Sequence, residues 1–194
     1  MVIAGIAFVA FVALSYFVWH DRGPSRFDAR FASDLPYLHH DDREFVSYLS
    51  YPGSEGFVII ESFVLAGIVL IRRRVVLDAV ACAVIPLIVS GISEYVLKPM
   101  IDRQSRDGTA LAFPSGHATG VTSVAVMAWL AWVSYWKSWP LRALGTLALI
   151  AVIGLVDMSR VWTTAHYVSD VIGGSLFALS VTSGLFLVCS PRRT

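Results

Sequence analysis

The chain has 194 residues, of which 56% belong to the hydrophobic set and only 15% are charged. A soluble domain of this length carries about 25% charged residues, so the composition excludes an ordinary soluble domain and predicts a membrane protein. The formal net charge is +1, which gives no overall field that would attract nucleic acid.

Six apolar stretches follow one another along the chain, and a bilayer takes about 20 helical residues to cross. Continuous apolar runs lack the alternation of a membrane β-barrel, so helices are the expected spanning elements. We therefore predict an all-α polytopic membrane protein with six transmembrane helices in a single domain, residues 1–194. The predicted spans cover residues 2–19, 56–71, 75–97, 117–136, 141–158 and 167–188.

The first predicted span lacks a basic leading segment and a clear cleavage site, so we expect an uncleaved helix and not a removed signal peptide. Residues 20–55, which follow it, are polar and mixed in charge. Phe27, Phe31, Leu35 and Leu38 recur there at helical spacing, although Pro36 interrupts the pattern, so a short helix lying in the membrane interface is one of two equal expectations. An ordinary connecting loop is the alternative.

Basic residues gather at three places that lie on one side of a six-span chain. Because basic loops stay in the cytoplasm, this pattern predicts cytoplasmic termini, an extracytoplasmic segment 20–55 and a location in the plasma (inner) membrane. The basic residues concerned are Arg72, Arg73, Arg74, Lys137, Arg142, Arg192 and Arg193.

Three polar clusters fall on the opposite, extracytoplasmic side of this topology. Charged side chains at membrane depth are costly and usually functional, so we expect the active site on that side. Arginine offers a planar fork to phosphate oxygens and lysine offers a compact charge. The cations expected to bind phosphate are Lys98, Arg103, Arg106 and Arg160.

The start of the fourth predicted span supplies an anion site. Ser115 and Gly116 begin that helix, where backbone N–H groups are unpaired, and glycine lets an anion approach closely. His117 follows them and could protonate a leaving oxygen. His166 and Asp170 are four residues apart on one helix face, so the carboxylate could orient the imidazole for nucleophilic attack.

Two motifs resemble the signature of the type 2 phosphatidic acid phosphatase superfamily, which also includes vanadium haloperoxidases and bacterial acid phosphatases. They are Pro114-Ser115-Gly116-His117 and Ser159-Arg160-x5-His166-x3-Asp170. The resemblance implies a six-helix membrane core that needs no metal or cofactor. It implies a phosphohistidine at His166, oriented by Asp170, with His117 serving the leaving group and then water. The phosphate-holding groups that it implies are Lys98, Arg160, Ser115 and the Gly116 backbone.

The first motif of that family is only partly present. The family has Lys-x6-Arg-Pro, often with another arginine two residues earlier. Counting from Lys98, Arg103 matches the earlier arginine, whereas Ser105 and Arg106 stand in place of the arginine and the proline. We expect Arg103 to supply the missing phosphate contact, with Arg106 as the alternative.

The resulting prediction is a metal-independent phosphatase acting on a membrane lipid, either a polyprenyl (di)phosphate or a glycerophospholipid phosphate. Its expected partners are that lipid and the surrounding membrane, and no oligomeric state is predicted. A membrane transporter or proton channel would also place histidine, aspartate and arginine within a bundle. A zinc hydrolase could use His117, His166 and Asp170, although the nearby cations oppose a divalent metal. A purely structural membrane protein is the remaining alternative.

Overall fold

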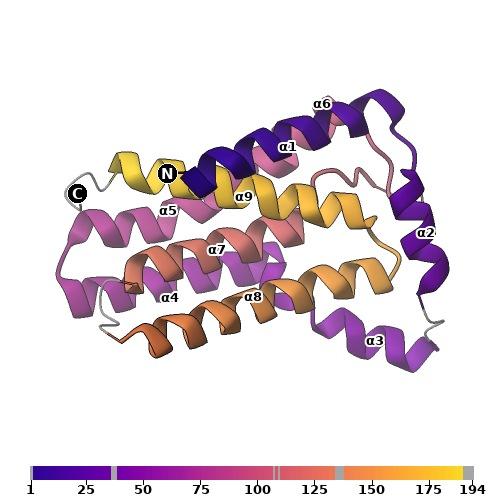
Figure 1. The fold of residues 1–194 in the computed structure, drawn as a ribbon. Helices are drawn as coiled ribbons and strands as arrows, with labels where there is room; N and C mark the ends of the chain where they lie inside the picture. Colours follow the sequence, from indigo (N-terminus) through magenta and orange to yellow (C-terminus); the bar gives the residue numbers. More distant parts are fainter. Residues whose placement is uncertain (1, 36–38, 107, 109, 134–137, 190–194) are drawn as a thin grey trace.

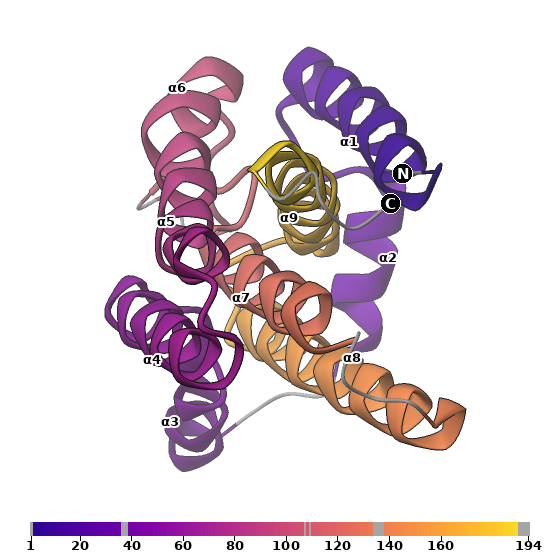
Figure 2. The same cartoon turned by 90° about the vertical axis from the view of Figure 1, so that its left-hand side faces the viewer.

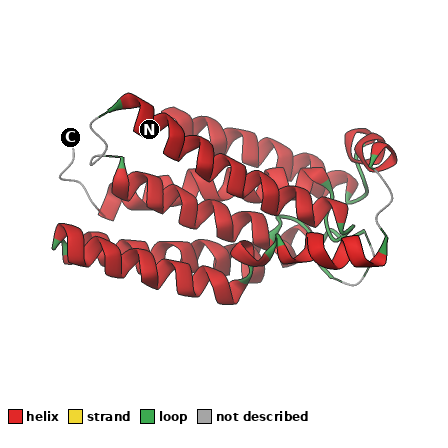
Figure 3. Cartoon of the chain, turned by 90° about the horizontal axis from the view of Figure 1, so that it is seen from below, coloured by secondary structure: helices red, strands yellow, loops and turns green. Residues whose placement is uncertain are grey.

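The computed structural model describes residues 2–35, 39–106, 108, 110–133 and 138–189 (Figure 1). Within these residues the regular structure is helical and contains no strand (Figure 3). The predicted all-α class is therefore confirmed. Six long helices run alongside one another, and two short ones cover one end of the bundle. The long helices are α1 (Val2–Asp21), α4 (Glu55–Arg73), α5 (Val76–Ile92), α7 (Gly116–Trp132), α8 (Trp139–Trp162) and α9 (Val168–Cys189).

Four helical stretches are long and apolar enough to cross a membrane: α1, α8, α9 and the continuous stretch from Val76 to Ile101. The other two long helices fall short for different reasons. Helix α4 has 19 residues but carries Glu55, Glu61, Arg72 and Arg73. Helix α7 has 17 described residues, and residues 134–136 of the predicted span lie outside the described part of the chain.

Helix α7 lies at the centre of the bundle, where it contacts α4, α5, α8 and α9 (Figure 2). Helix α9 lies between α7 and α1. Lipid is as apolar as the side chains between these helices, so close packing holds them together more than the removal of water does. At Gly174 a Cβ would lie 2.5 Å from the Ser115 carbonyl oxygen and 2.9 Å from Ala118 Cβ, so glycine allows α9 to approach the start of α7.

The outward faces of the long helices are apolar and exposed. Phe17 on α1, Ile71 on α4, and Leu144 and Leu147 on α8 all have more than half of their surface uncovered. Large exposed apolar faces on parallel helices are the arrangement that a hydrocarbon environment requires. The fold is therefore that of a multi-pass membrane protein.

The polar segment after α1 forms helix α2 (Arg26–Asp34), so the expectation of a short helix is confirmed, while Leu38 of the pattern lies outside the described residues. A capping box begins it: the Ser25 hydroxyl accepts from the Asp28 N–H, and the Asp28 carboxylate accepts from the Ser25 N–H. Phe31 and Leu35 pack against apolar side chains of α7, α8 and α9. Helix α3 (His40–Tyr48) and a short 3-10 turn, η1 (Tyr51–Gly53), complete the segment.

Helix α5 does not stop at Ile92 but continues through a π turn, η2 (Ser93–Leu97), into α6 (Lys98–Ile101). Single π turns within helices are frequent at functional sites, because the extra residue redirects the side chains that follow. The start of α7, the end of α8 and the start of α9 meet at the same end of the bundle as α2 and α3 (Figure 1). The polar clusters of the sequence are thus brought together.

Candidate active site

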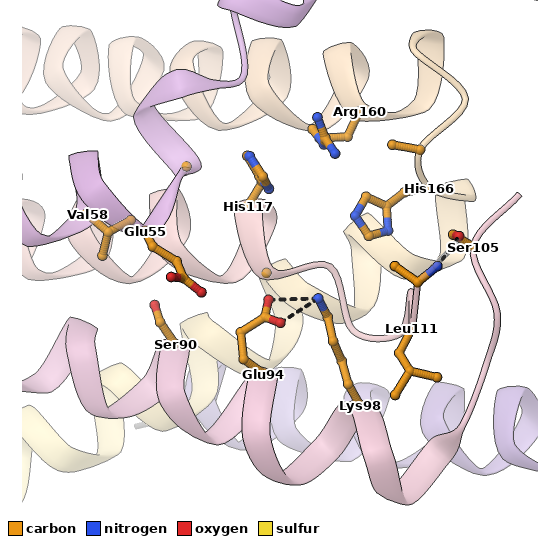
Figure 4. Close-up of a pocket in the computed structure, with 14 residues that line it drawn as sticks. Glu55, Val58, Ser90, Glu94, Lys98, Ser105, Leu111, His117, Arg160 and His166 are labelled. Atoms are coloured by element: carbon orange, nitrogen blue, oxygen red, sulfur yellow. Dashed lines mark hydrogen bonds and ion pairs between the residues drawn. The ribbon is translucent and has the colours of Figure 1, made fainter. Parts of the chain in front are cut away.

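A cavity of about 360 Å³ opens at this end of the bundle. Figure 4 shows His117, His166 and Arg160 around one space, with Lys98 approaching from the opposite side. The residues of the predicted site that line the cavity are Lys98, Gly116, His117, Arg160 and His166. They come from α6, α7, α8 and the loop before α9, so residues far apart in the sequence converge as the motif spacing indicated.

The start of α7 presents its backbone to the cavity. Ser115 is the N-cap, and its buried hydroxyl accepts from the Ala118 N–H at 3.5 Å, so this side chain caps the helix. Gly116 is the first helical residue, and a side chain there would overlap the Glu94 carboxylate and lie 3.7 Å from Lys98 Nζ. With glycine at this position, the Glu94 carboxylate can lie against the start of α7, next to Lys98.

Lys98 already has a carboxylate partner. Its Nζ donates to both oxygens of Glu94, each at 2.7 Å, and the two side chains keep 14% and 25% of their surface exposed. Glu94 belongs to the π turn that precedes α6, which brings the carboxylate next to Gly116. A phosphate that enters the cavity must therefore compete with Glu94 for Lys98.

His166 lies in the loop between α8 and α9, and only 7% of its surface is exposed. Its Nδ1 is 3.6 Å from Oδ2 of the fully buried Asp170, slightly beyond hydrogen-bond length. Catalytic hydrogen bonds are often this long before a substrate binds. With Nδ1 beside the carboxylate, Nε2 is the nitrogen left to attack a substrate.

The protonation state of His166 suits a nucleophile. Burial is the main reason that its pKa is lowered from 6.5, and the Arg160 and Lys98 cations act in the same direction. The Asp170 carboxylate opposes them and only partly restores the pKa. At neutral pH the imidazole is therefore neutral, as nucleophilic attack requires.

Neither arginine of the partial motif lines the cavity. We had expected Arg103, or Arg106 in its place, to contact the phosphate there. Arg103 is 1% exposed, and its guanidinium donates to two buried carboxylates, those of Asp28 and Asp170. Arg106 donates to the Val161 carbonyl at 3.4 Å and lies over the Tyr167 ring. Two buried carboxylates hold Arg103 away from the cavity.

Several cavity residues were not expected from the sequence. Ser105, which stands where the family has its motif arginine, lines the cavity itself, and acidic and hydroxyl side chains border the part nearest α4 and α5. These are Glu55, Ser90 and Glu94. The spacing of four between Glu94 and Lys98 was a usable signal for their ion pair. The capping box at Ser25 signalled the start of α2, but nothing local to Asp28 indicated that it would contact Arg103.

Two histidines and two cations line one cavity at the end of a bundle of apolar helices, an arrangement that suits the binding of an anionic group. The chain belongs to the PAP2 superfamily, whose model matches residues 4–193. The family resemblance and the phosphatase class predicted from the motifs are thus confirmed, in preference to a transporter or a structural protein.

The fold has also been seen in a solved structure, described as the crystal structure of the first transmembrane PAP2 type phosphatidylglycerolphosphate phosphatase from Bacillus subtilis. The TM-score is 0.79, the sequence identity is 20%, and the similarity covers 100% of this chain and 98% of that one. None of the curated proteins matches this chain. At this identity the likeness shows a shared fold.

Proposed function

We propose that this protein hydrolyses the phosphate of a membrane lipid through a phosphohistidine at His166, without a metal or cofactor. The observation that carries the proposal is the shared cavity: His166 and His117 line it together with Lys98 and Arg160 (Figure 4). Asp170 Oδ2 lies 3.6 Å from His166 Nδ1, and the Asp170 side chain is fully buried and does not line the cavity. This arrangement supplies a nucleophile, an orienting carboxylate, a proton donor and a phosphate cradle.

The proposed reaction has two displacements at phosphorus. In the first, His166 Nε2 attacks the phosphorus, the bond to the leaving oxygen breaks, and His117 gives that oxygen a proton. In the second, water attacks the phosphohistidine, the phosphorus–nitrogen bond breaks, and His117 takes the proton from water. Lys98, Arg160 and the Gly116 N–H offset the negative charge that develops on the phosphate oxygens.

The proposed substrates carry their apolar tails in the bilayer, because the helices around the site present apolar faces outward. Two classes fit, a glycerophospholipid phosphate and a polyprenyl (di)phosphate. The Bacillus subtilis protein of similar fold is a phosphatidylglycerolphosphate phosphatase, which supports testing the first class first.

Purified protein is expected to release inorganic phosphate from at least one of these lipids in detergent. Vanadate, which adopts a five-coordinate geometry, resembles the transition state of phosphoryl transfer and should inhibit competitively, because such analogues bind more tightly than substrates. A chelator should leave the rate unchanged. Phosphate release, measured with and without each compound, checks all three expectations.

Two results would count against the proposal. Activity that disappears with chelator and returns with zinc would favour the zinc hydrolase alternative, with His117, His166 and Asp170 as ligands. Failure to release phosphate from any member of either lipid class would remove the lipid substrate altogether.

We further propose six membrane spans, with both termini in the cytoplasm and the site on the extracytoplasmic face. Helix α4 ends, and α8 begins, at the end of the bundle away from the site (Figure 1). The basic residues Arg72, Arg73 and Arg142 belong to those two helix ends, which supports this orientation. Lys137, Arg192 and Arg193 lie outside the described residues.

Cysteine labelling in intact cells checks the topology. Gln104 and Ser138 are both exposed and lie at opposite ends of the bundle. In a chain with Cys82 and Cys189 replaced, Gln104→Cys should react with an impermeant thiol reagent, whereas Ser138→Cys should react only after permeabilisation. The reverse pattern would put the site in the cytoplasm.

A further inference from the structure

A buried polar cluster ties helix α2 to the carboxylate behind His166. Arg103 Nη1 donates to Asp170 Oδ1 and to the Ser169 hydroxyl, each at 2.7 Å. Its Nη2 donates to Asp28 Oδ2 at 3.0 Å and to the Gly23 carbonyl at 2.9 Å. The guanidinium therefore bridges one carboxylate from the polar segment and one from α9.

Asp28 has contacts of its own to α9, so Arg103 does not hold it alone. The Ser169 N–H donates to Asp28 Oδ1 at 2.9 Å, and the Ser169 hydroxyl donates to Asp28 Oδ2 at 2.7 Å. Burial raises the pKa of Asp28, but the hydrogen bonds from Ser169, Arg103 and Ser25 outweigh it and leave the pKa below its usual value. Asp28 is thus a carboxylate at neutral pH.

The cluster is too deeply buried to be an ordinary surface ion pair. The side chains of Arg103, Asp28 and Asp170 expose 1%, 0% and 0% of their surface. Burying three charges is costly, and it is tolerated only where hydrogen bonds satisfy nearly every polar atom. Hydrogen bonds on this scale hold the members of the cluster in one arrangement.

The buried cluster fixes the orientation of the Asp170 carboxylate. Arg103 occupies Oδ1, and the Tyr167 N–H donates to Oδ2 at 2.8 Å, so the carboxylate has one rotation available. In that rotation Oδ2 points toward His166 Nδ1. The Arg103 guanidinium also lies over the ring of Tyr167, 4.5 Å from the ring centroid. Tyr167 is the residue that follows His166 in the chain.

We propose that Arg103 and Asp28 form a positioning pair, in which Arg103 orients Asp170 toward His166 and Asp28 holds and balances Arg103. The inference rests on the proposed role of His166 as nucleophile. It assigns Arg103 to the carboxylate behind the nucleophile and not to the phosphate. It also gives the polar segment after α1 a part in catalysis, through a side chain that never touches the substrate.

Three variants test the pair: Arg103→Gln, Arg103→Lys and Asp28→Asn, assayed for phosphate release from a short-chain phosphatidylglycerol phosphate in detergent. Each should lower kcat by about 10- to 100-fold, the loss that follows when the partners that orient histidines in metal sites are removed. KM should change by less than about twofold, because neither side chain lines the cavity.

The acidic limb of the kcat/KM profile separates positioning from mere structural support, because His166 attacks only when it is neutral. Arg103→Gln removes a positive charge near Asp170, so protonated His166 is favoured and the limb moves to higher pH. Asp28→Asn removes a negative charge and moves the limb to lower pH. Lys98, Arg160 and His117 act on His166 equally in every variant.

Arg103→Lys separates charge from geometry. Lysine keeps the positive charge, so the acidic limb should stay in place. It cannot reach Asp28, Asp170 and Ser169 from one planar fork, so kcat should still fall. Arg22→Gln is the matched control, because Arg22 forms an exposed ion pair with Asp102 in the same region and should keep wild-type kinetics.

The inference is overturned if Asp28→Asn keeps the wild-type kcat and pH profile, or if Arg103→Gln raises KM as a lost phosphate ligand would. It is also overturned if all three variants fail to fold by circular dichroism and gel filtration, since the pair is then structural alone. The proposed function fails separately, if the wild type releases no phosphate or if His166→Ala stays active.

Discussion

Replacing His166 with alanine is expected to abolish turnover while the helices remain in place. The side chain lines the cavity and has a carboxylate 3.6 Å from Nδ1, so the proposed mechanism uses it to attack phosphorus. Without it the enzyme lacks a covalent path, and removing a nucleophile costs about a million-fold in a well-studied hydrolase. Steady-state phosphate release should fall below detection.

The covalent intermediate gives an independent check on the same residue. During rapid quench with phosphate-labelled substrate, the wild type should carry an acid-labile, base-stable label on His166, and the alanine variant should carry none. His20→Ala serves as the control, because His20 is an exposed histidine at the end of α1 and lies outside the cavity. Substantial turnover by the alanine variant at position 166 would falsify the nucleophile assignment.

The sequence alone could predict the helices and the convergence of the motifs. Each of the six apolar runs corresponds to a long helix in the described residues, because runs of this length have no other stable form in lipid. Lys98, His117, Arg160 and His166 were expected to converge because the helix ends that carry them were predicted to lie on the same side of the membrane. All four line one cavity.

Contacts between distant polar side chains could not be predicted in the same way. Arg103 and Asp28 are 75 residues apart, and their pairing depends on how α2 folds back over the ends of the bundle. Motif spacing placed Arg103 near the phosphate, but spacing cannot say which of several nearby anions a guanidinium will choose. The two carboxylates at hydrogen-bond distance decided that choice.

The balance of charges around the cavity could not be predicted from the sequence either. Ser105 takes the place of the motif arginine in the sequence and also lines the cavity, so the substitution leaves the site with one cation fewer than the family motif provides. Glu94 further offsets the charge of Lys98. The net charge of the cavity depends on where Ser105 and the π turn that carries Glu94 lie in space, which the sequence does not specify.

Replacing Asp170 with asparagine should lower kcat by about 10,000-fold, the loss seen when a histidine-orienting aspartate in a catalytic triad becomes an amide. Both oxygens of Asp170 are in use: Oδ1 accepts from Arg103 and Oδ2 from the Tyr167 N–H. Asparagine has one acceptor oxygen, so it must lose one of these bonds. If the oxygen stays with Arg103, the amide N–H groups face the Tyr167 N–H and His166 Nδ1. The imidazole then accepts at Nδ1, carries its proton on Nε2 and has no lone pair with which to attack.

A second carboxylate provides the matched control for Asp170→Asn. Asp157 on α8 accepts from the Ser175 hydroxyl at 3.0 Å and does not line the cavity, so Asp157→Asn can keep that bond and should retain near-wild-type turnover. Asp170→Asn should also lower the free energy of unfolding by about 1–3 kcal/mol, because one hydrogen bond to a charged group is lost. Phosphate release and thermal unfolding of the two variants, measured side by side, separate the two effects. Similar kcat values for both variants would show that Asp170 does not orient His166. Another group would then have to keep the proton on Nδ1 and leave Nε2 free to attack.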